Sequence, residues 1–146
     1  MVRVYSVAED AIIERKPVDK NVSEWKAVLD PETFLVTRKK GTEPPFTGRY
    51  HDCSRKGVYT CRCCRSDLFE SREKFDSGTG WPSFRLPVSN LNIRIKLDRS
   101  HGMERDEVLC AVCSAHLGHV FDDGPPPGGL RFCINSAALR LKEQIL

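Results

Sequence analysis

The sequence predicts a mainly β domain with short helices near its N-terminus, on two observations. Short runs of β-branched and aromatic residues, separated by Gly, Pro, Ser and Asp, recur after about residue 50, as expected for antiparallel strands. Helix signals occur only before Gly41. With 146 residues, we expect one domain over 1–146, made of a helical segment over about 1–41 and a β-rich core over about 42–146.

Two short helices are predicted within the first segment. Ser23 is placed to cap a helix that runs to Leu29, because a hydroxyl there accepts a hydrogen bond from the first free backbone amides. Asp30 precedes Pro31, which puts a capping carboxylate before a proline at the first helical position. Gly41 is expected to end this second helix, and the Gly, Pro and polar residues of 42–50 predict a loop that wraps the core.

Five strands are predicted after this loop. The clearest lies in 93–97, where apolar and basic residues alternate as in a strand with one solvent-exposed face. The others are short apolar runs between turn residues. The predicted strands are Gly57–Cys61, Ile93–Leu97, Glu107–Cys110, His119–Phe121 and Leu130–Asn135.

Composition argues against several classes of protein. The net charge is only +3 and the basic residues are interspersed with acids, so there is no nucleic-acid footprint. Glu9 and Asp10 interrupt any N-terminal signal core, and no run approaches the roughly 20 apolar residues of a membrane span. Seven cysteines, an odd number that includes metal-type pairs, fit a reducing compartment. We expect a cytoplasmic protein with neither a nucleic-acid nor a membrane partner.

Four of the cysteines form two C-x-x-C pairs, Cys61/Cys64 and Cys110/Cys113. Each such turn points two sulfurs at one place, and together they supply the four thiolates of a closed, structural zinc site. The pairs are further apart than in a local zinc ribbon, so this site would join distant parts of a larger fold. Cys61 and Cys63 would form a C-x-C pair with one residue between them, but Cys61 and Cys64 reproduce the C-x-x-C spacing of the second pair. A thioredoxin-type redox motif is the alternative, although neither pair opens a helix after a strand.

Cys133 stands alone in a strand-like run. Residues two apart on a strand share a face, so Arg131, Cys133 and Asn135 would line up together. A guanidinium beside a thiol favours the thiolate, which is the nucleophilic form of cysteine. The alternative is a small buried core cysteine.

Two histidines and a tryptophan are further candidates for the site. His116 and His119 follow the second cysteine pair closely, so a metal site would hold both imidazoles in place and one could supply a proton. A purely structural histidine is the alternative, and His116 could also replace a cysteine as a zinc ligand. The glycine-rich turn 75–84 presents Trp81, whose flat face suits a small methyl-bearing group, unless it is an ordinary core residue.

These motifs together resemble the methionine-R-sulfoxide reductase family, usually called MsrB, over about 23–141. The resemblance is specific because many short motifs occur in one order. The matching stretches are 41–43, 50–52, the first C-x-x-C with 68–69, 74–78, 80–84, 101–103, 107–113, 116–121 and 131–136.

The resemblance implies two facing antiparallel sheets and a structural zinc ion, one per chain, on the side away from the active site. It implies reduction of the R epimer of methionine sulfoxide, free or in proteins. Cys133 would attack the sulfoxide sulfur and become a sulfenic acid. The sulfoxide oxygen would be held and protonated by His116, His119 and Asn135.

Three further roles follow from the resemblance. Trp81 would receive the S-methyl group of the substrate. Arg131, steadied by Asp123, would favour the Cys133 thiolate. The protein is expected to be a monomer that takes its electrons from thioredoxin or another dithiol.

The sequence departs from the family pattern at two places. Thr79 stands where many members have a resolving cysteine, so another thiol must reduce the sulfenic acid. Cys53, in a polar stretch, is the preferred candidate, with Cys63 as the alternative and direct reduction by an external dithiol as a third route. Arg65 and Ser114 replace the glycine usual after each C-x-x-C and must accept the turn with more strain.

Two rival functions remain open at this point. A zinc-ribbon module that binds nucleic acid or a protein partner would leave Cys133 merely buried and would need a basic face around the cysteine pairs. Only a modest one is available, made of Arg62, Arg65, Arg72 and Lys74. A zinc or redox sensor, whose cysteine pairs oxidise and release the metal, is the other alternative.

Overall fold

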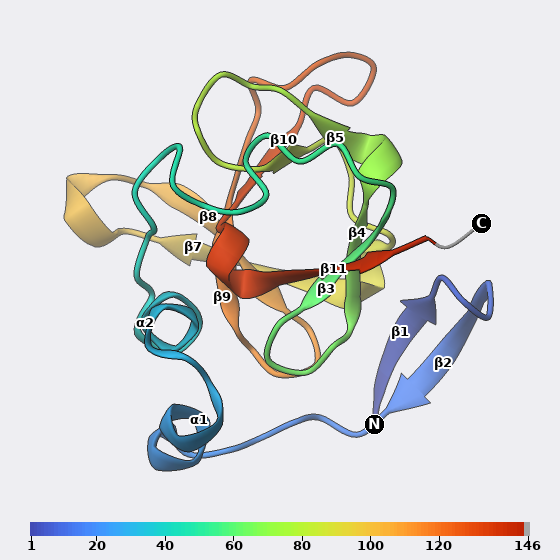
Figure 1. The fold of residues 1–146 in the computed structure, drawn as a ribbon, viewed down its shortest axis with the longest axis vertical. Coiled ribbons are helices and arrows are strands. Elements are labelled where there is room, and N and C mark those ends of the chain that lie inside the picture. Colours follow the sequence, from blue (N-terminus) through green and yellow to red (C-terminus); the bar gives the residue numbers. More distant parts are fainter. Residues whose placement is uncertain (145–146) are drawn as a thin grey trace.

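The computed structural model describes residues 1–144 and shows a mainly β fold with two short α-helices (Figure 1). The helices are α1 (Val22–Val28) and α2 (Pro31–Lys39). The strands are β1 (Val2–Ser6), β2 (Ala11–Arg15), β3 (Gly57–Cys61), β4 (Asp67–Glu70), β5 (Lys74–Phe75), β6 (Ser83–Phe84), β7 (Ile93–Asp98), β8 (Arg105–Cys110), β9 (His116–Phe121), β10 (Arg131–Ile134) and β11 (Leu139–Glu143). The last two residues of the expected domain, 145–146, lie outside the described part.

Two antiparallel sheets form the body of the fold. One has the strand order β5-β6-β10-β9-β8-β7, and the other has the order β11-β3-β4. Aromatic rings pack between the two sheets. Phe69 of β4 stacks on Phe84 of β6 at a centroid distance of 4.5 Å. Tyr59 of β3 meets the same Phe84 ring edge-on at 5.2 Å. The expected pair of sheets is therefore present, with a further two-stranded sheet, β1-β2, beside it.

The expectation that 1–41 is helical is wrong for its first part. Residues 2–15 form the antiparallel hairpin of β1 and β2, which Figure 1 shows apart from the other strands. The fully buried side chain of Asn92 holds this hairpin to the body of the protein. Its Oδ1 accepts from the Tyr5 backbone amide at 2.8 Å, and its Nδ2 donates to the Tyr5 carbonyl at 3.0 Å. Asn92, which is distant in sequence, thus stabilises β1 and β2, although their residue pattern alone is only weak evidence for strands.

The two helices lie close to their predicted positions. The predicted Ser23 cap is wrong, because α1 is capped by Asn21, which exchanges side-chain-to-backbone hydrogen bonds with Glu24 in a capping box. For α2 the prediction is confirmed: Asp30 accepts from the third helical amide, at 3.3 Å, and Pro31 is the first helical residue. The helix ends at Lys39, two residues before Gly41, and its C-cap Lys40 adopts the left-handed conformation.

All five predicted strands are present, with bounds that shift by up to three residues. The strand predicted over 119–121 begins at His116, and the one predicted over 130–135 covers only Arg131–Ile134. Strands β5 and β6 have two residues each, too few for periodicity to reveal. Within residues 1–144, neither helix has the length and apolar character needed to cross a membrane.

Candidate functional site

Strand pairing in the larger sheet gathers several polar residues into one row. Across β8, β9, β10 and β6, Glu107 pairs with His119, His119 with Cys133, and Cys133 with Ser83. Directly opposite residues of antiparallel strands project from the same face of the sheet. The cysteine and one histidine singled out in the sequence are therefore neighbours on one face.

A β-bulge brings His116 to this same face. Val108 pairs with Gly118 but Leu109 pairs with His116, so Leu117 is an extra residue in β9. In a regular strand two residues three apart would point to opposite faces, and one inserted residue reverses that relation. The imidazole rings of His116 and His119 accordingly meet edge-to-face, with centroids 5.4 Å apart.

A cleft of about 190 Å³ opens beside Cys133. Its walls include most of the side chains that the sequence singled out for chemistry, whereas His116 is 3% exposed and does not line it. Thr79, which stands where the resemblance leads us to expect a resolving cysteine, is part of the wall. The lining residues are Thr42, Thr79, Trp81, Arg105, His119, Phe121, Arg131, Cys133, Ile134 and Asn135.

Arg131 is the cation nearest to the Cys133 thiol along the strand. Its Nε and Nη2 donate to the two carboxylate oxygens of Asp123 at 2.8 and 3.2 Å, and its guanidinium lies 4.5 Å from the centroid of the Phe121 ring. Burial raises the pKa of the Cys133 thiol, and the charge of Arg131 opposes this rise only in part. Burial therefore favours the thiol form of Cys133, and Arg131 limits the rise in pKa without reversing it.

Each histidine is bound through one ring nitrogen to a carboxylate that sequence reasoning missed. His119 Nε2 lies 2.9 Å from Asp98 Oδ2, an interaction that holds the pKa of Asp98 well below its usual range. His116 Nδ1 lies 2.7 Å from Oε2 of the fully buried Glu107. Burial lowers the pKa of His116, although Glu107 opposes this. For Glu107, the sequence offered one signal, an acidic residue within a predicted strand of otherwise apolar residues.

Asn135 and Trp81 both hold the loop that follows α2. Asn135 Oδ1 accepts from the Glu43 backbone amide at 3.0 Å, and its Nδ2 donates to the Leu117 carbonyl at 3.0 Å. Trp81 Nε1 donates to the Glu43 carbonyl at 2.9 Å. The Asn135 amide thus already binds backbone groups from two segments, which makes it a brace for the cleft.

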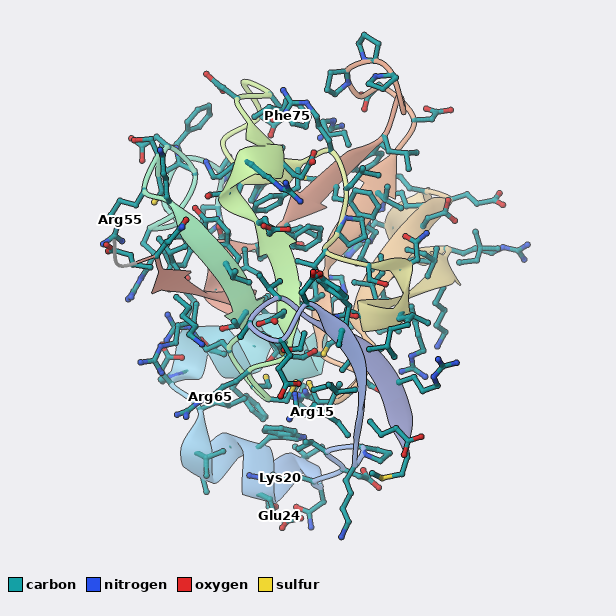
Figure 2. The ribbon with its side chains drawn as sticks, turned by 90° about the vertical axis from the view of Figure 1, so that its right-hand side faces the viewer. Arg15, Lys20, Glu24, Arg55, Arg65 and Phe75 are labelled. Atoms are coloured by element: carbon teal, nitrogen blue, oxygen red, sulfur yellow. The ribbon has the colours of Figure 1, made fainter. Side chains whose placement is uncertain are left out.

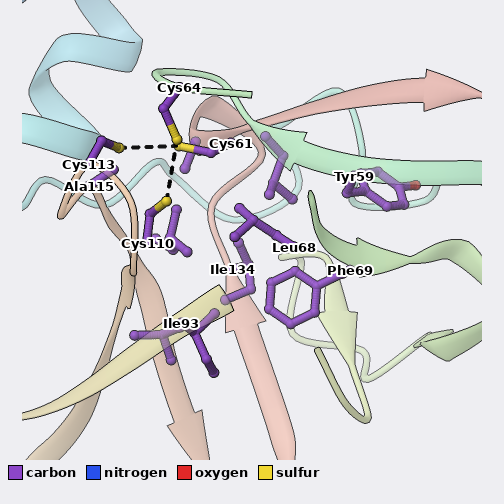
Figure 3. Packing of buried hydrophobic residues seen from close by; sticks show 14 of the residues in the cluster. Tyr59, Cys61, Cys64, Leu68, Phe69, Ile93, Cys110, Cys113, Ala115 and Ile134 are labelled. Atoms are coloured by element: carbon purple, nitrogen blue, oxygen red, sulfur yellow. Dashed lines mark hydrogen bonds between the residues drawn. The ribbon is translucent and has the colours of Figure 1, made fainter. Parts of the chain in front are cut away.

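The four cysteines of the two C-x-x-C pairs converge at a second site (Figure 3). Their sulfurs lie within 4.8 Å of one another, with Cys61 3.6 Å from Cys113 and Cys64 3.5 Å from Cys110. Zinc–sulfur bonds of about 2.3 Å in a tetrahedron would place sulfurs about 3.8 Å apart, so the cluster fits such an ion. Cys63 is outside this group, and Cys64 is the member of the pair, as the spacing predicted.

The two cysteine turns have matching geometry. Arg65 and Ser114 follow them in the left-handed conformation, with φ of 66° and 64°, and donate their amides to the carbonyls of Cys61 and Cys110 at 2.7 and 2.9 Å. The expected strain is therefore real, and non-glycine residues pay about 1 kcal/mol each for this conformation.

Two arginines outside the motifs support the cysteine cluster. Arg38 of α2 donates to the Cys113 carbonyl at 2.8 Å and to the Cys113 sulfur at 3.1 Å, while its guanidinium stacks on Trp25 at 4.1 Å. Arg15 of the hairpin donates to the Cys64 carbonyl at 3.1 Å. Figure 2 shows Arg15 near the end of the molecule that carries α1, where Arg65 also lies.

The two spare cysteines occupy different environments. Cys53 lines a cavity of about 510 Å³ that shares Trp81 with the Cys133 cleft. Burial raises the pKa of Cys53, but hydrogen bonds with Tyr59 and Arg55 outweigh it and lower the pKa overall. Cys63 lies beside the metal-type cluster, with its sulfur 3.4 Å from Thr37 Oγ1, and hydrogen bonding with Cys113 raises its pKa.

Comparison with known proteins agrees with this arrangement. The family model described as "SelR domain" matches residues 29–143. The chain is 58% identical over 127 residues, 87% of its length, to a protein from Pseudomonas putida (strain W619) named peptide methionine sulfoxide reductase MsrB, and covers 96% of that protein. Proteins of the same name from Herminiimonas arsenicoxydans and Acinetobacter baylyi are 58% and 54% identical, over 84% and 86% of this chain and 90% of each relative. The chain therefore belongs to the SelR domain family, the family of the MsrB reductases.

Proposed function

We propose that the protein reduces methionine-R-sulfoxide, free or in proteins, to methionine, with Cys133 as the nucleophile. The observation that carries this proposal is the position of Cys133 in the cleft, opposite His119 and two residues after Arg131. The family and its relatives, which are named as methionine sulfoxide reductases, support the same reaction. As an oxidoreductase of this family, the chain needs a reductant for each turnover.

The proposed first step forms one bond and breaks another. The Cys133 thiolate attacks the sulfoxide sulfur, and the oxygen takes up protons as its charge grows. The sulfur–oxygen bond to methionine then breaks, an oxygen bonds to the Cys133 sulfur, and the transient sulfur–sulfur bond breaks to release the thioether. The net result is transfer of the oxygen to Cys133 as a sulfenic acid, with the cysteine sulfur oxidised and the substrate sulfur reduced by two electrons. His119 lines the cleft and the His116 ring packs against the His119 ring, so these two imidazoles supply the protons. Asn135 braces the wall of the cleft. Trp81 offers an apolar surface to the S-methyl group.

Recycling requires a second thiol, because Thr79 cannot supply one. Attack of this thiol on the sulfenic acid forms a disulfide and releases water, and an external dithiol of the thioredoxin class then reduces the disulfide. Cys53 is the preferred candidate, since its cavity adjoins the cleft at Trp81 and its lowered pKa favours the thiolate. Cys63 is the alternative, but its pKa, raised by hydrogen bonding with Cys113 and by burial, leaves less of the thiolate.

The cysteine cluster is proposed to hold one Zn²⁺ ion with a structural role. Four thiolates complete a tetrahedral shell and leave no position for a substrate. The cluster also lies at the Cys110 end of β8, whereas Arg105 at the other end lines the cleft, about 17 Å away along an extended strand. When bound, the ion would cross-link the two cysteine turns, which come from the β3–β4 and β8–β9 connections.

The binding-module alternative finds little support in the basic residues near the cysteine turns. Arg62 donates to the Leu139 carbonyl at 3.1 Å, Arg72 pairs with Glu70 at 3.3 Å, and Lys74 is half-buried. We propose that the protein is cytoplasmic, because seven free thiols suit a reducing compartment, and that it acts as a monomer.

The test uses the resolved R and S epimers of a methionine sulfoxide with dithiothreitol, and follows methionine. The R epimer should be reduced and the S epimer left unchanged, and Cys133→Ser should abolish the reaction. Cys53→Ser should keep one stoichiometric turnover but lose turnover supported by thioredoxin, with Cys63→Ser as the matched control. Reduction that persists in Cys133→Ser would contradict the proposed nucleophile, and the Cys53 phenotype in Cys63→Ser would reverse the choice between them.

A further inference from the structure

Glu107 is a charged residue of the sheet for which the reaction above has no role. Its side chain is 0% exposed, in the middle of β8. A buried carboxylate is costly unless it is paired, because the low-dielectric interior solvates its charge poorly. Its two oxygens have different partners: Oε2 lies 2.7 Å from His116 Nδ1, and Oε1 lies 3.4 Å from Lys40 Nζ.

The other nitrogen of His116 has no partner. Within the described residues, its Nε2 is buried without a hydrogen bond, although buried polar atoms are normally paired. The ring lies edge-to-face with His119, which lines the cleft, and on the same face of the sheet as Cys133. An unpaired nitrogen on the sheet face that carries the reacting thiol suits a group that is completed by the substrate.

We propose that Glu107 is a positioning residue that fixes His116 with its proton on Nδ1 and so reserves Nε2 for the sulfoxide oxygen. This inference rests on the proposed function. When His116 is protonated, the Glu107 carboxylate supports the imidazolium, which then donates its Nε2 proton to the oxygen that leaves the substrate sulfur. The positive charge of Lys40, whose Nζ lies 3.4 Å from Oε1, partly offsets the cost of burying the Glu107 carboxylate.

His119 complements this arrangement. It is bound to Asp98 through Nε2, the opposite ring nitrogen, which leaves Nδ1 for the cleft. The two imidazoles therefore present different nitrogens to one region, and each is oriented by its own carboxylate. A carboxylate that orients a histidine is a common device where the choice of tautomer matters.

Glu107→Gln tests the role of the charge with little change in shape. Single-turnover reduction of the R epimer by pre-reduced protein should slow by at least about tenfold, part of the 10²–10⁴ that a positioned general acid contributes. The KM for the sulfoxide should change less than twofold. Asp106→Asn, at an exposed position of the same strand, removes the same charge and should leave the rate unchanged. Lys40→Met, at a half-exposed position, should slow the reaction in the same direction by a smaller factor.

A second readout separates orientation from general disruption. ¹⁵N NMR of His116 should show the proton on Nδ1 in the wild type, and a lowered imidazolium pKa in Glu107→Gln, so the alkaline limb of the rate profile moves to lower pH. The charged or titratable groups that the described residues place around His116 are Glu107 from β8, His119 from β9 and Lys40 after α2. Zinc content and melting temperature establish that each variant folds.

The outcomes distinguish this inference from the function on which it rests. A wild-type protein that leaves the R epimer unreduced refutes the proposed function. If the wild type is active but Glu107→Gln reacts at the normal rate, or if Asp106→Asn loses as much, Glu107 has no positioning role. A wild-type His116 protonated on Nε2 alone would equally overturn the inference, whatever the activity.

Discussion

Replacing Asn135 with alanine would remove the brace between the cleft and the loop after α2. The side chain makes two buried hydrogen bonds, to the Glu43 amide and to the Leu117 carbonyl. The Glu43 amide would be left buried and unpaired, at a cost of about 1–3 kcal/mol, whereas the Leu117 carbonyl keeps its bond from the Asn135 backbone amide. With about 1 kcal/mol for the lost bond to Leu117, the free energy of unfolding should fall by about 2–4 kcal/mol. The lower half of this range applies if water enters the space.

The assay is urea denaturation of the zinc-loaded protein followed by far-UV circular dichroism, combined with steady-state kinetics. Because the Glu43 carbonyl also accepts the Trp81 indole, loosening the loop should raise KM for the sulfoxide more than it lowers kcat. Asn90→Ala, at an exposed position, is the matched control and should change stability by less than about 0.5 kcal/mol. A loss below about 1 kcal/mol with a large fall in kcat would refute this reasoning, and would mean that Asn135 acts directly on the substrate.

Three further predictions concern the thiol, the metal-type cluster and His119. Burial raises the pKa of Cys133, so the rate of its alkylation by iodoacetamide, measured by mass spectrometry, should increase with pH through a midpoint above that of an ordinary cysteine. Arg131→Met should move this midpoint higher still. A midpoint below that of an ordinary cysteine would contradict the direction of the shift. Arg38→Met should speed chelator-driven zinc release by roughly 10-fold, as is typical for loss of an outer-shell partner, while Lys39→Met should not. Asp98→Asn should slow single-turnover reduction of the R epimer several-fold, because the carboxylate that orients the His119 ring is lost; an unchanged rate would show that this contact has no orienting role.

The cysteine pattern was the most informative part of the sequence. Two identical C-x-x-C spacings were enough to predict that Cys61, Cys64, Cys110 and Cys113 meet, because only such turns offer four thiols to one ion. The period of two in 131–135 likewise predicted that Arg131, Cys133 and Asn135 share one wall. Local rules of this kind hold because the geometry of a turn or strand depends mainly on its own residues.

Local rules failed where a partner distant in sequence decided the outcome. The hairpin of β1 and β2 is held by Asn92, and no feature of residues 2–15 predicts that contact. The hydrogen bonds of Asn135 to Glu43 and Leu117 were not foreseen, because they join segments far apart in the chain. The carboxylates of Asp98 and Glu107 were overlooked for the same reason.

The sequence by itself determined the mainly β class, the cysteine cluster, the family and the place of Cys133 on its strand, since all of these depend on spacing and residue type. Only the tertiary structure decided which groups surround that thiol and how they are charged. The bulge at Leu117 brings His116 beside His119, strand pairing sets Glu107 in line with Cys133, and burial raises the pKa of the thiol despite Arg131. Such features depend on strand register and on the exclusion of water, which arise only when distant segments pack together.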